Sequence, residues 1–151
     1  MVTRIAINGF GRIGRMFFRA AQHDRKIKII AINDLTDTKT LAHLLKFDST
    51  HGVMSKKVTA TKDSIQIGKD KIPVFSERNP EKLPWKALKI DVVLESTGFF
   101  VDPMKAQLHI NAGAKKVLLS APAKPKEDCK IKHTTIVKGV NEKGYNKNNT
   151  H

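Results

Sequence analysis

The sequence predicts an α/β fold with a doubly wound, mainly parallel sheet and an inserted antiparallel meander. A strand-like apolar run, 3–7, leads through the glycine-rich segment 8–15 into an amphipathic helical run, 15–22. A second strand-like run, 28–33, ends on an acidic residue, and strands and helices alternate again in the last third of the chain. Such alternation is typical of parallel sheets that carry helices on both faces.

The glycine-rich segment has the spacing Gly-x-Gly-x-x-Gly. Gly9 permits a tight turn out of the strand, Gly11 lets the backbone approach a pyrophosphate, and Gly14 lets the helix pack against the strand. The N–H groups of the first helical turn, at the positive end of the helix dipole, then face the phosphates. A glycine triple alone is a weak signal, but here a strand precedes it and a helix follows. This context predicts a Rossmann-type dinucleotide site.

Asp34 follows the second strand, twenty residues after Gly14. Its carboxylate is expected to accept hydrogen bonds from the hydroxyls of a ribose, and its charge would repel a 2′-phosphate. We therefore expect NAD rather than NADP as the cofactor. The alternative is a glycine-rich turn without a ligand and a solvated Asp34, which the surrounding strand and helix pattern disfavours.

A helix is expected after the polar cluster 36–38, which can cap its first turn. Leu41, Leu44 and Leu45 have the spacing of one apolar helical face, and the helix is expected to end near Phe47.

Short strands and a punctuated loop follow this helix. Residues 68–70 form a hairpin signal between two strand candidates, and Trp85 stands in a proline-bounded loop or one-turn helix, where it is expected to anchor the core. The strand candidates of this region are 57–61, 64–67 and 71–75.

The last third of the chain returns to alternating elements. The nearly all-apolar run 91–95 predicts a strand covered on both faces, and 103–113 predicts a helix. Residues 117–119 predict another buried strand, and 134–137 an edge or late strand. A polar tail is expected from Asn141.

The ends of these predicted strands mark the expected ligand crevice. In open α/β sheets the ligand lies across the carboxyl ends of the strands. This rule selects Asn8, Asp34, Thr97 and Ser120. For Thr97 and Ser120, ordinary turn chemistry at the end of a strand explains the residue type equally well.

Length and composition indicate a single domain, 1–151, since 40% of the 151 residues are hydrophobic. The single cysteine, Cys129, fits a reducing compartment, and neither a signal peptide nor a membrane-spanning run is evident. We expect a cytoplasmic protein without a membrane partner.

The formal net charge of +14 raises the possibility of a nucleic-acid partner. However, the lysines are scattered through nearly every segment, and only 6% of the residues are aromatic. A lysine-rich solvated surface explains the charge better, and no nucleic-acid partner is expected.

Six motifs stand in order along the chain: residues 7–15, 31–34, 47–52, 95–98, 112–117 and 120–122. Together they closely resemble the N-terminal half of phosphorylating glyceraldehyde-3-phosphate dehydrogenases. The resemblance covers essentially the whole chain, as far as 139–141, and the six ordered motifs make it specific.

The resemblance implies a role in binding NAD for residues that spacing alone does not identify. Arg12 and Ile13 would lie over the pyrophosphate and beside the nicotinamide, and Arg78 at the adenine end. Thr97, Gly98 and Phe100 would line the adenine and ribose side, whereas Ser120 would line the nicotinamide ribose. The full set of expected cofactor-binding residues is Asn8, Gly9, Phe10, Gly11, Arg12, Ile13, Asp34, Arg78, Thr97, Gly98, Phe100 and Ser120.

The family reaction oxidises glyceraldehyde 3-phosphate with NAD and phosphate through a cysteine thioester, with a histidine as general base. The family's Ser-x-Ala-Ser-Cys segment is not present in the sequence, which stops at His151 just before that segment would begin. The resemblance thus implies that the C-terminal catalytic domain is missing, that the chain is inactive alone, and that the whole enzyme is a homotetramer. The cofactor half of an erythrose-4-phosphate dehydrogenase and a non-enzymatic nucleotide- or RNA-binding module are the alternatives.

Cys129 and His133 are weighed as substitutes for the family's catalytic pair. They are four residues apart with lysines nearby, but a shared face would require a helix, and the segment lacks helical periodicity. Two ligands are also too few for a typical metal site. We therefore expect no catalytic residue and no metal site in this chain.

Overall fold

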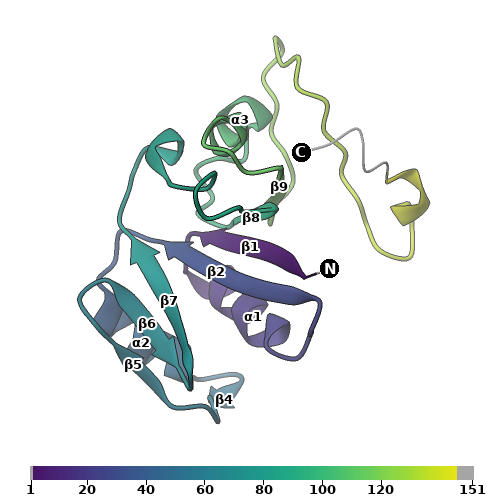
Figure 1. The fold of residues 1–151 in the computed structure, drawn as a ribbon. Coiled ribbons are helices and arrows are strands. Elements are labelled where there is room, and N and C mark those ends of the chain that lie inside the picture. Colours follow the sequence, from purple (N-terminus) through teal and green to yellow (C-terminus); the bar gives the residue numbers. More distant parts are fainter. Residues whose placement is uncertain (1, 146–151) are drawn as a thin grey trace.

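The computed structural model describes residues 2–145 and contains a seven-stranded sheet of order β5-β6-β7-β2-β1-β8-β9 (Figure 1). Residues 146–151, the end of the expected polar tail, lie outside the described part. The strands of this sheet are β1 (Thr3–Asn8), β2 (Ile27–Asn33), β5 (Val58–Ala60), β6 (Ser64–Ile67), β7 (Asp70–Phe75), β8 (Val92–Glu95) and β9 (Lys116–Leu119).

Parallel and antiparallel pairing divide the sheet. The β7–β2, β2–β1, β1–β8 and β8–β9 pairs are parallel, whereas β5–β6 and β6–β7 are antiparallel. A separate two-stranded ladder, which the sequence did not predict, pairs β3 (Phe47–Asp48) with β4 (Gly52–Val53). The doubly wound, mainly parallel sheet with an antiparallel meander is thus confirmed.

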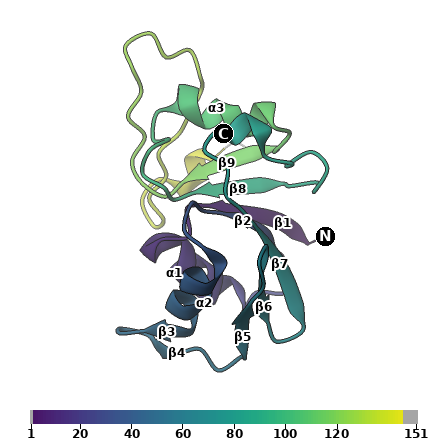
Figure 2. The same cartoon turned by 90° about the vertical axis from the view of Figure 1, so that its left-hand side faces the viewer.

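Helices cover both faces of the sheet. Figure 2 shows α1 and α2 together against one face, whereas α3 lies at the β8–β9 end. The α-helices are α1 (Arg12–Ala21), α2 (Thr38–Lys46) and α3 (Pro103–Asn111), and the 3₁₀ helices are η1 (Pro80–Lys82) and η2 (Glu142–Gly144).

Two apolar layers follow from the alternation of side chains along β1. Ile5 and Ile7 point into a cluster with Phe18 of α1, whereas Ala6 points into a second cluster that contains Trp85. Trp85 is fully buried, as expected for a core anchor. Because a strand presents alternate residues to opposite faces, both faces of β1 are covered and the strand is fixed at the centre of the fold.

The helices α1 and α2 begin in different ways. α1 begins three residues before the expected Arg15, because Gly11 already serves as its N-cap and the Arg15 N–H donates to the Gly11 carbonyl at 3.0 Å. α2 begins as the polar cluster predicts, with the Asp37 carboxylate accepting from the Thr40 N–H.

Two apolar assignments were wrong. Leu44 is 38% exposed, and the buried face of α2 is formed by Leu41, Ala42 and Leu45. Leu118 is 51% exposed. It pairs with the buried Leu94 and shares its face of the sheet, but it lies beyond the part of that face that α1 covers.

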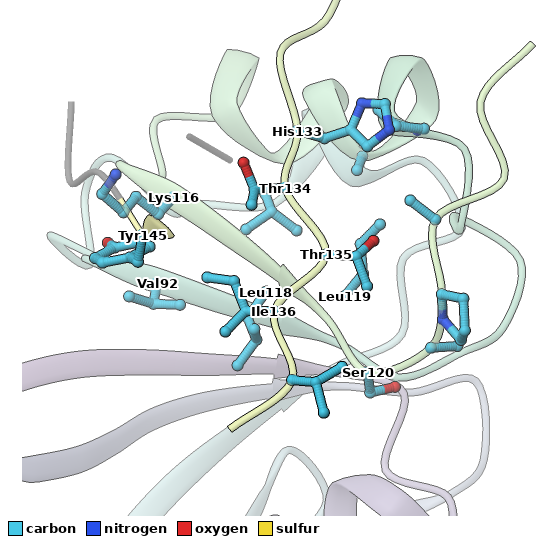
Figure 3. Close-up of a pocket in the computed structure, with 17 residues that line it drawn as sticks. Val92, Lys116, Leu118, Leu119, Ser120, His133, Thr134, Thr135, Ile136 and Tyr145 are labelled. Atoms are coloured by element: carbon cyan, nitrogen blue, oxygen red, sulfur yellow. The ribbon is translucent and has the colours of Figure 1, made fainter. Parts of the chain in front are cut away.

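The expected strand at 134–137 is absent from the described residues. The side chain of Asn141 makes hydrogen bonds with two backbone groups of this segment. Its amide donates to the Thr135 carbonyl, and its oxygen accepts from the Val137 N–H. A strand requires a partner for these groups. The segment instead crosses beside β9 without pairing with it (Figure 3).

Candidate functional site

A cleft of about 440 Å³ lies at the carboxyl ends of β1, β2 and β8. Strand-end residues and the loops that follow them supply its walls, as the rule for open α/β sheets predicts. Its lining residues are Asn8, Gly9, Gly11, Asn33, Asp34, Leu35, Glu77, Arg78, Ser96, Thr97, Phe99 and Phe100.

The turn from β1 into α1 requires glycine at two positions. Gly9 has a φ of +91°, and a Cβ on it would lie 2.6 Å from the Thr97 nitrogen. A Cβ on Gly14 would lie 2.3 Å from the Gly9 carbonyl oxygen. Both positions therefore let α1 approach the ends of β1 and β8 closely.

Gly11 differs from these two glycines because it borders open space. A Cβ on Gly11 would meet no atom within 4 Å, and the residue lines the cleft. It is also the N-cap of α1, with no side-chain cap and no acidic residue in the first turn. Backbone N–H groups without a side-chain cap, at the positive end of a helix dipole, suit an anionic pyrophosphate.

The Asp34 carboxylate is held in place by two backbone N–H groups, one from the turn after β1 and one from the loop that carries Asp34 itself. One carboxylate oxygen accepts from the Phe10 N–H at 2.6 Å, and the other accepts from the Thr36 N–H at 2.9 Å. Each carboxylate oxygen can accept more than one hydrogen bond, so both can still accept from the hydroxyls of a ribose. The acceptor oxygens of Asp34 and the open helix terminus at Gly11 together fit a dinucleotide.

The opposite wall comes from the loop after β8. The Thr97 N–H and hydroxyl both donate to the Glu95 carboxylate, and the Thr97 hydroxyl oxygen accepts from the Phe99 N–H. Arg78 is exposed and lines the cleft from the loop after β7. The ring of Phe100 lines the cleft and also meets His109 edge to face, with 6.1 Å between ring centroids.

Five residues expected to bind the cofactor do not line this cleft. The Phe10 side chain is buried in the core, which leaves only its backbone at the turn. Gly98 stands between two lining residues with a φ of +78°. Arg12 and Ile13 are exposed in the first turn of α1.

Ser120 is the fifth of these residues. It follows β9, where its N–H donates to the Glu95 carbonyl, but it lines a different pocket of about 590 Å³. Figure 3 shows this pocket between β9 and the 133–137 segment. Ser120 is thus at the predicted end of the sheet but is not part of the described cleft.

Sequence reasoning missed several lining residues: Asn33, Leu35, Glu77, Ser96 and Phe99. Asn33 ends β2 and Ser96 follows β8, so the strand-end rule applied to every strand would have found both. Glu77 and Phe99 lie further along their loops, and no local pattern indicates them.

Cys129 and His133 contact the same backbone carbonyl. The Cys129 thiol and the His133 Nδ1 each lie near the carbonyl oxygen of Ile131, at 3.9 and 3.0 Å. Their segment contains no helix. Among residues 2–145, no cluster of three or more His, Cys, Asp or Glu side chains has a geometry that could hold a metal. In the same range, no helix is sufficiently long and apolar to cross a bilayer.

Comparisons with known proteins agree with this geometry. The profile of the family described as "Glyceraldehyde 3-phosphate dehydrogenase, NAD binding domain" matches residues 3–103, which is more than half of the chain.

Curated relatives extend the match beyond the profile. The chain is 54% identical to a glyceraldehyde-3-phosphate dehydrogenase of Mycoplasma pneumoniae over 95% of its length, and 52% identical to one of Thermotoga maritima over 93%. It is 47% identical to one of Geobacillus stearothermophilus over 96%. It spans only 41%, 41% and 42% of these relatives. The chain therefore belongs to the glyceraldehyde-3-phosphate dehydrogenase family and carries its NAD-binding domain.

Proposed function

We propose that the cleft binds NAD through three groups of residues. The first-turn N–H groups of α1 bind the pyrophosphate beside Gly11, and Asp34 accepts from a ribose. Arg78, Thr97 and Phe100 line the adenine end, with Arg12, Ile13, Gly98 and Ser120 completing the site around the bound cofactor. The observation that carries the proposal is the uncapped, open helix terminus at Gly11 beside a fixed carboxylate.

We infer that this binding serves an oxidoreductase acting on glyceraldehyde 3-phosphate. The names of the relatives and the matching family profile support this substrate. When bound, NAD would supply the hydride acceptor, while the residues described here bind and orient it. The resemblance also supports a cytoplasmic homotetramer in which the catalytic cysteine and histidine come from a further domain.

We propose that residues 1–151 alone bind the cofactor without turning over substrate. The thiol of the single cysteine, Cys129, contacts the Ile131 carbonyl oxygen, and the family's catalytic Ser-x-Ala-Ser-Cys segment is not present in the sequence. Purified chain, NAD, phosphate and glyceraldehyde 3-phosphate would give no NADH absorbance above background. Measurable turnover would contradict this proposal.

Gly11→Val tests the binding proposal. A valine side chain would fill the space beside the first turn of α1, while the fold would tolerate it because Gly11 has an ordinary negative φ of −70°. We expect NAD affinity by calorimetry to fall at least about tenfold, or about 1.4 kcal/mol. Gly144→Val is the matched control, since a Cβ there also meets nothing within 4 Å and the site is in η2. Equal affinity for both variants would reject the proposed site.

A further inference from the structure

A carboxylate lies buried beneath the cleft without lining it. Glu95, the last residue of β8, is 2% exposed. One oxygen accepts from the Thr97 N–H at 2.8 Å and from the Thr97 hydroxyl, and the other accepts from the Asn8 amide at 2.6 Å and lies 3.1 Å from His109 Nε2. A buried carboxylate is costly unless its oxygens are satisfied, and here four neighbouring donors face them.

The His109 ring can hold its proton in only one position within this network. The Trp85 indole N–H donates to His109 Nδ1 at 3.0 Å, so Nδ1 must be an acceptor. The proton of the neutral ring is therefore on Nε2, which faces Glu95. Both Trp85 and His109 are fully buried, so water does not compete for these bonds.

The same network continues under the cleft to the adenine side. The Asn8 side-chain oxygen accepts from the Asn33 amide at 2.7 Å. The Asn33 side chain in turn bonds both the N–H and the carbonyl of Glu77, each at 2.9 Å. Glu77 precedes Arg78, so this chain of hydrogen bonds joins the ends of β8, β1 and β2 to the loop that carries Arg78.

We propose that Glu95 is a positioning residue for the dinucleotide site, with His109 and Trp85 fixing the direction of the hydrogen bonds that reach it. The inference rests on the proposed function of the cleft. The Glu95 carboxylate meets the cleft through Thr97 and Asn8, both of which line it. The role depends on acceptor oxygens on both sides of the carboxylate, since each oxygen faces donors.

Glu95→Gln tests this dependence with little change in volume. The glutamine N–H₂ group would face N–H or O–H donors in either orientation, so one side of the network would open. We expect the variant to remain folded, as measured by circular dichroism, and to bind NAD about tenfold more weakly by calorimetry. Wild-type affinity in a folded Glu95→Gln variant would overturn the inference while leaving the proposed function intact. Failure of the wild-type chain to bind NAD would instead reject the proposed function.

Two substitutions at His109 distinguish a role in hydrogen bonding from a role in packing. They also test the inference if the Glu95→Gln variant does not fold. His109→Gln retains one donor and one acceptor, whereas His109→Leu retains neither. We expect the glutamine variant to bind NAD within about threefold of wild type and the leucine variant to lose about tenfold. Equal affinities for the two variants would overturn the inference. His43→Gln, on the exposed side of α2, is the matched control and should leave the affinity for NAD unchanged.

The position of the proton on the His109 ring can be measured, and a change in stability alone would not alter it. In ¹⁵N spectra of the wild-type chain, His109 should show a proton on Nε2 and a bare Nδ1. In Trp85→Phe, which removes the indole donor together with part of the buried ring system, this preference should weaken and NAD affinity should fall. An Nδ1-protonated ring in the wild-type chain would contradict the proposed network.

Discussion

Asp34 and Glu95 show how position decides what a carboxylate does. They stand at the ends of β2 and β8, the two strands that flank β1. Asp34 lines the cleft and is held by two backbone N–H groups, which leaves lone pairs for a ligand. Glu95 is buried and its oxygens face only protein donors. The first can recognise a ribose, whereas the second can only organise its neighbours.

Asp34→Asn is expected to weaken the preference for NAD over NADP. The substitution removes the negative charge that opposes a 2′-phosphate and one strong acceptor for the ribose, and a hydrogen bond to a charged group contributes about 1.5–3 kcal/mol. We expect NAD affinity to fall about tenfold or more, and NADP affinity to fall less or to rise. Calorimetry with both cofactors measures the ratio.

Asp37→Asn is the control for this experiment, because it makes the same change three residues later, at the N-cap of α2. Its ratio of NAD to NADP affinity should equal that of the wild-type chain. An unchanged ratio in Asp34→Asn would show that this carboxylate does not read the ribose.

Individual site residues were predictable where a local pattern marks them. The glycine spacing and the acid after the second strand identified Gly9, Gly11 and Asp34, all of which line the cleft. The pairing of Trp85 with His109 depends on how α3 packs over the sheet, and these residues are far apart in the sequence. No periodicity or motif marks such a contact, so only the structure reveals the buried network.

At the scale of elements, the turn between β1 and α1 is tightly constrained by its glycines. Gly9→Ala would put a methyl group into the backbone at Ser96 and Thr97, at a φ of +91°. We expect a loss of about 2 kcal/mol or more in the free energy of unfolding, because strain and overpacking add. Gly68→Ala, with a φ of +59° and nothing within 4 Å, is the control and should cost about 1 kcal/mol. Equal losses in urea denaturation would show that the close approach is not important.

The β3–β4 hairpin provides a pH-dependent element. The backbone N–H and then the side chain of His51 lower the pKa of Asp48 from 3.8 to about 2. A carboxyl whose pKa is lowered by folding stabilises the fold above the unfolded pKa, and this stabilisation is lost as the pH falls toward the folded pKa.

We therefore expect wild-type chain to be more stable than Asp48→Asn at pH 5, with the difference shrinking between about pH 4 and pH 2. Urea midpoints measured across this range test the expectation. A difference that stays constant with pH would mean that the Asp48 charge does not contribute.

Element types were predictable wherever apolar periodicity was long and the ends were marked by glycine, proline or a capping residue. The central strands, the three helices and the 64–67 and 71–75 strands follow this rule. The prediction of a strand at 134–137 was wrong. The composition of this run suits a strand, but Asn141 provides competing hydrogen bonds. Such competition arises from the turn that follows and cannot be read from the run itself.

At the scale of the whole molecule, the β9 end differs from the rest of the sheet. It exposes apolar side chains, whereas most apolar side chains of β1 and β2 are buried. The exposed residues of this region are Leu118, Ile136, Val137 and Tyr145.

This exposed apolar region predicts weak self-association of the chain. Sedimentation velocity should show a concentration-dependent increase in mean sedimentation coefficient, and Leu118→Thr should reduce it. Val53→Thr is a matched control, since Val53 is 63% exposed but lies in the β3–β4 hairpin. Monomeric behaviour at high concentration would contradict the prediction.

In the proposed function, N–H groups at the start of α1 and the Asp34 carboxylate hold NAD together. Titration of ¹⁵N-labelled chain with NAD, followed by amide chemical shifts, tests it directly. We expect the largest shifts at residues 9–15 and 96–100, which surround the cleft. Shifts confined to the β9 pocket, or no shifts in a folded chain, would contradict the account.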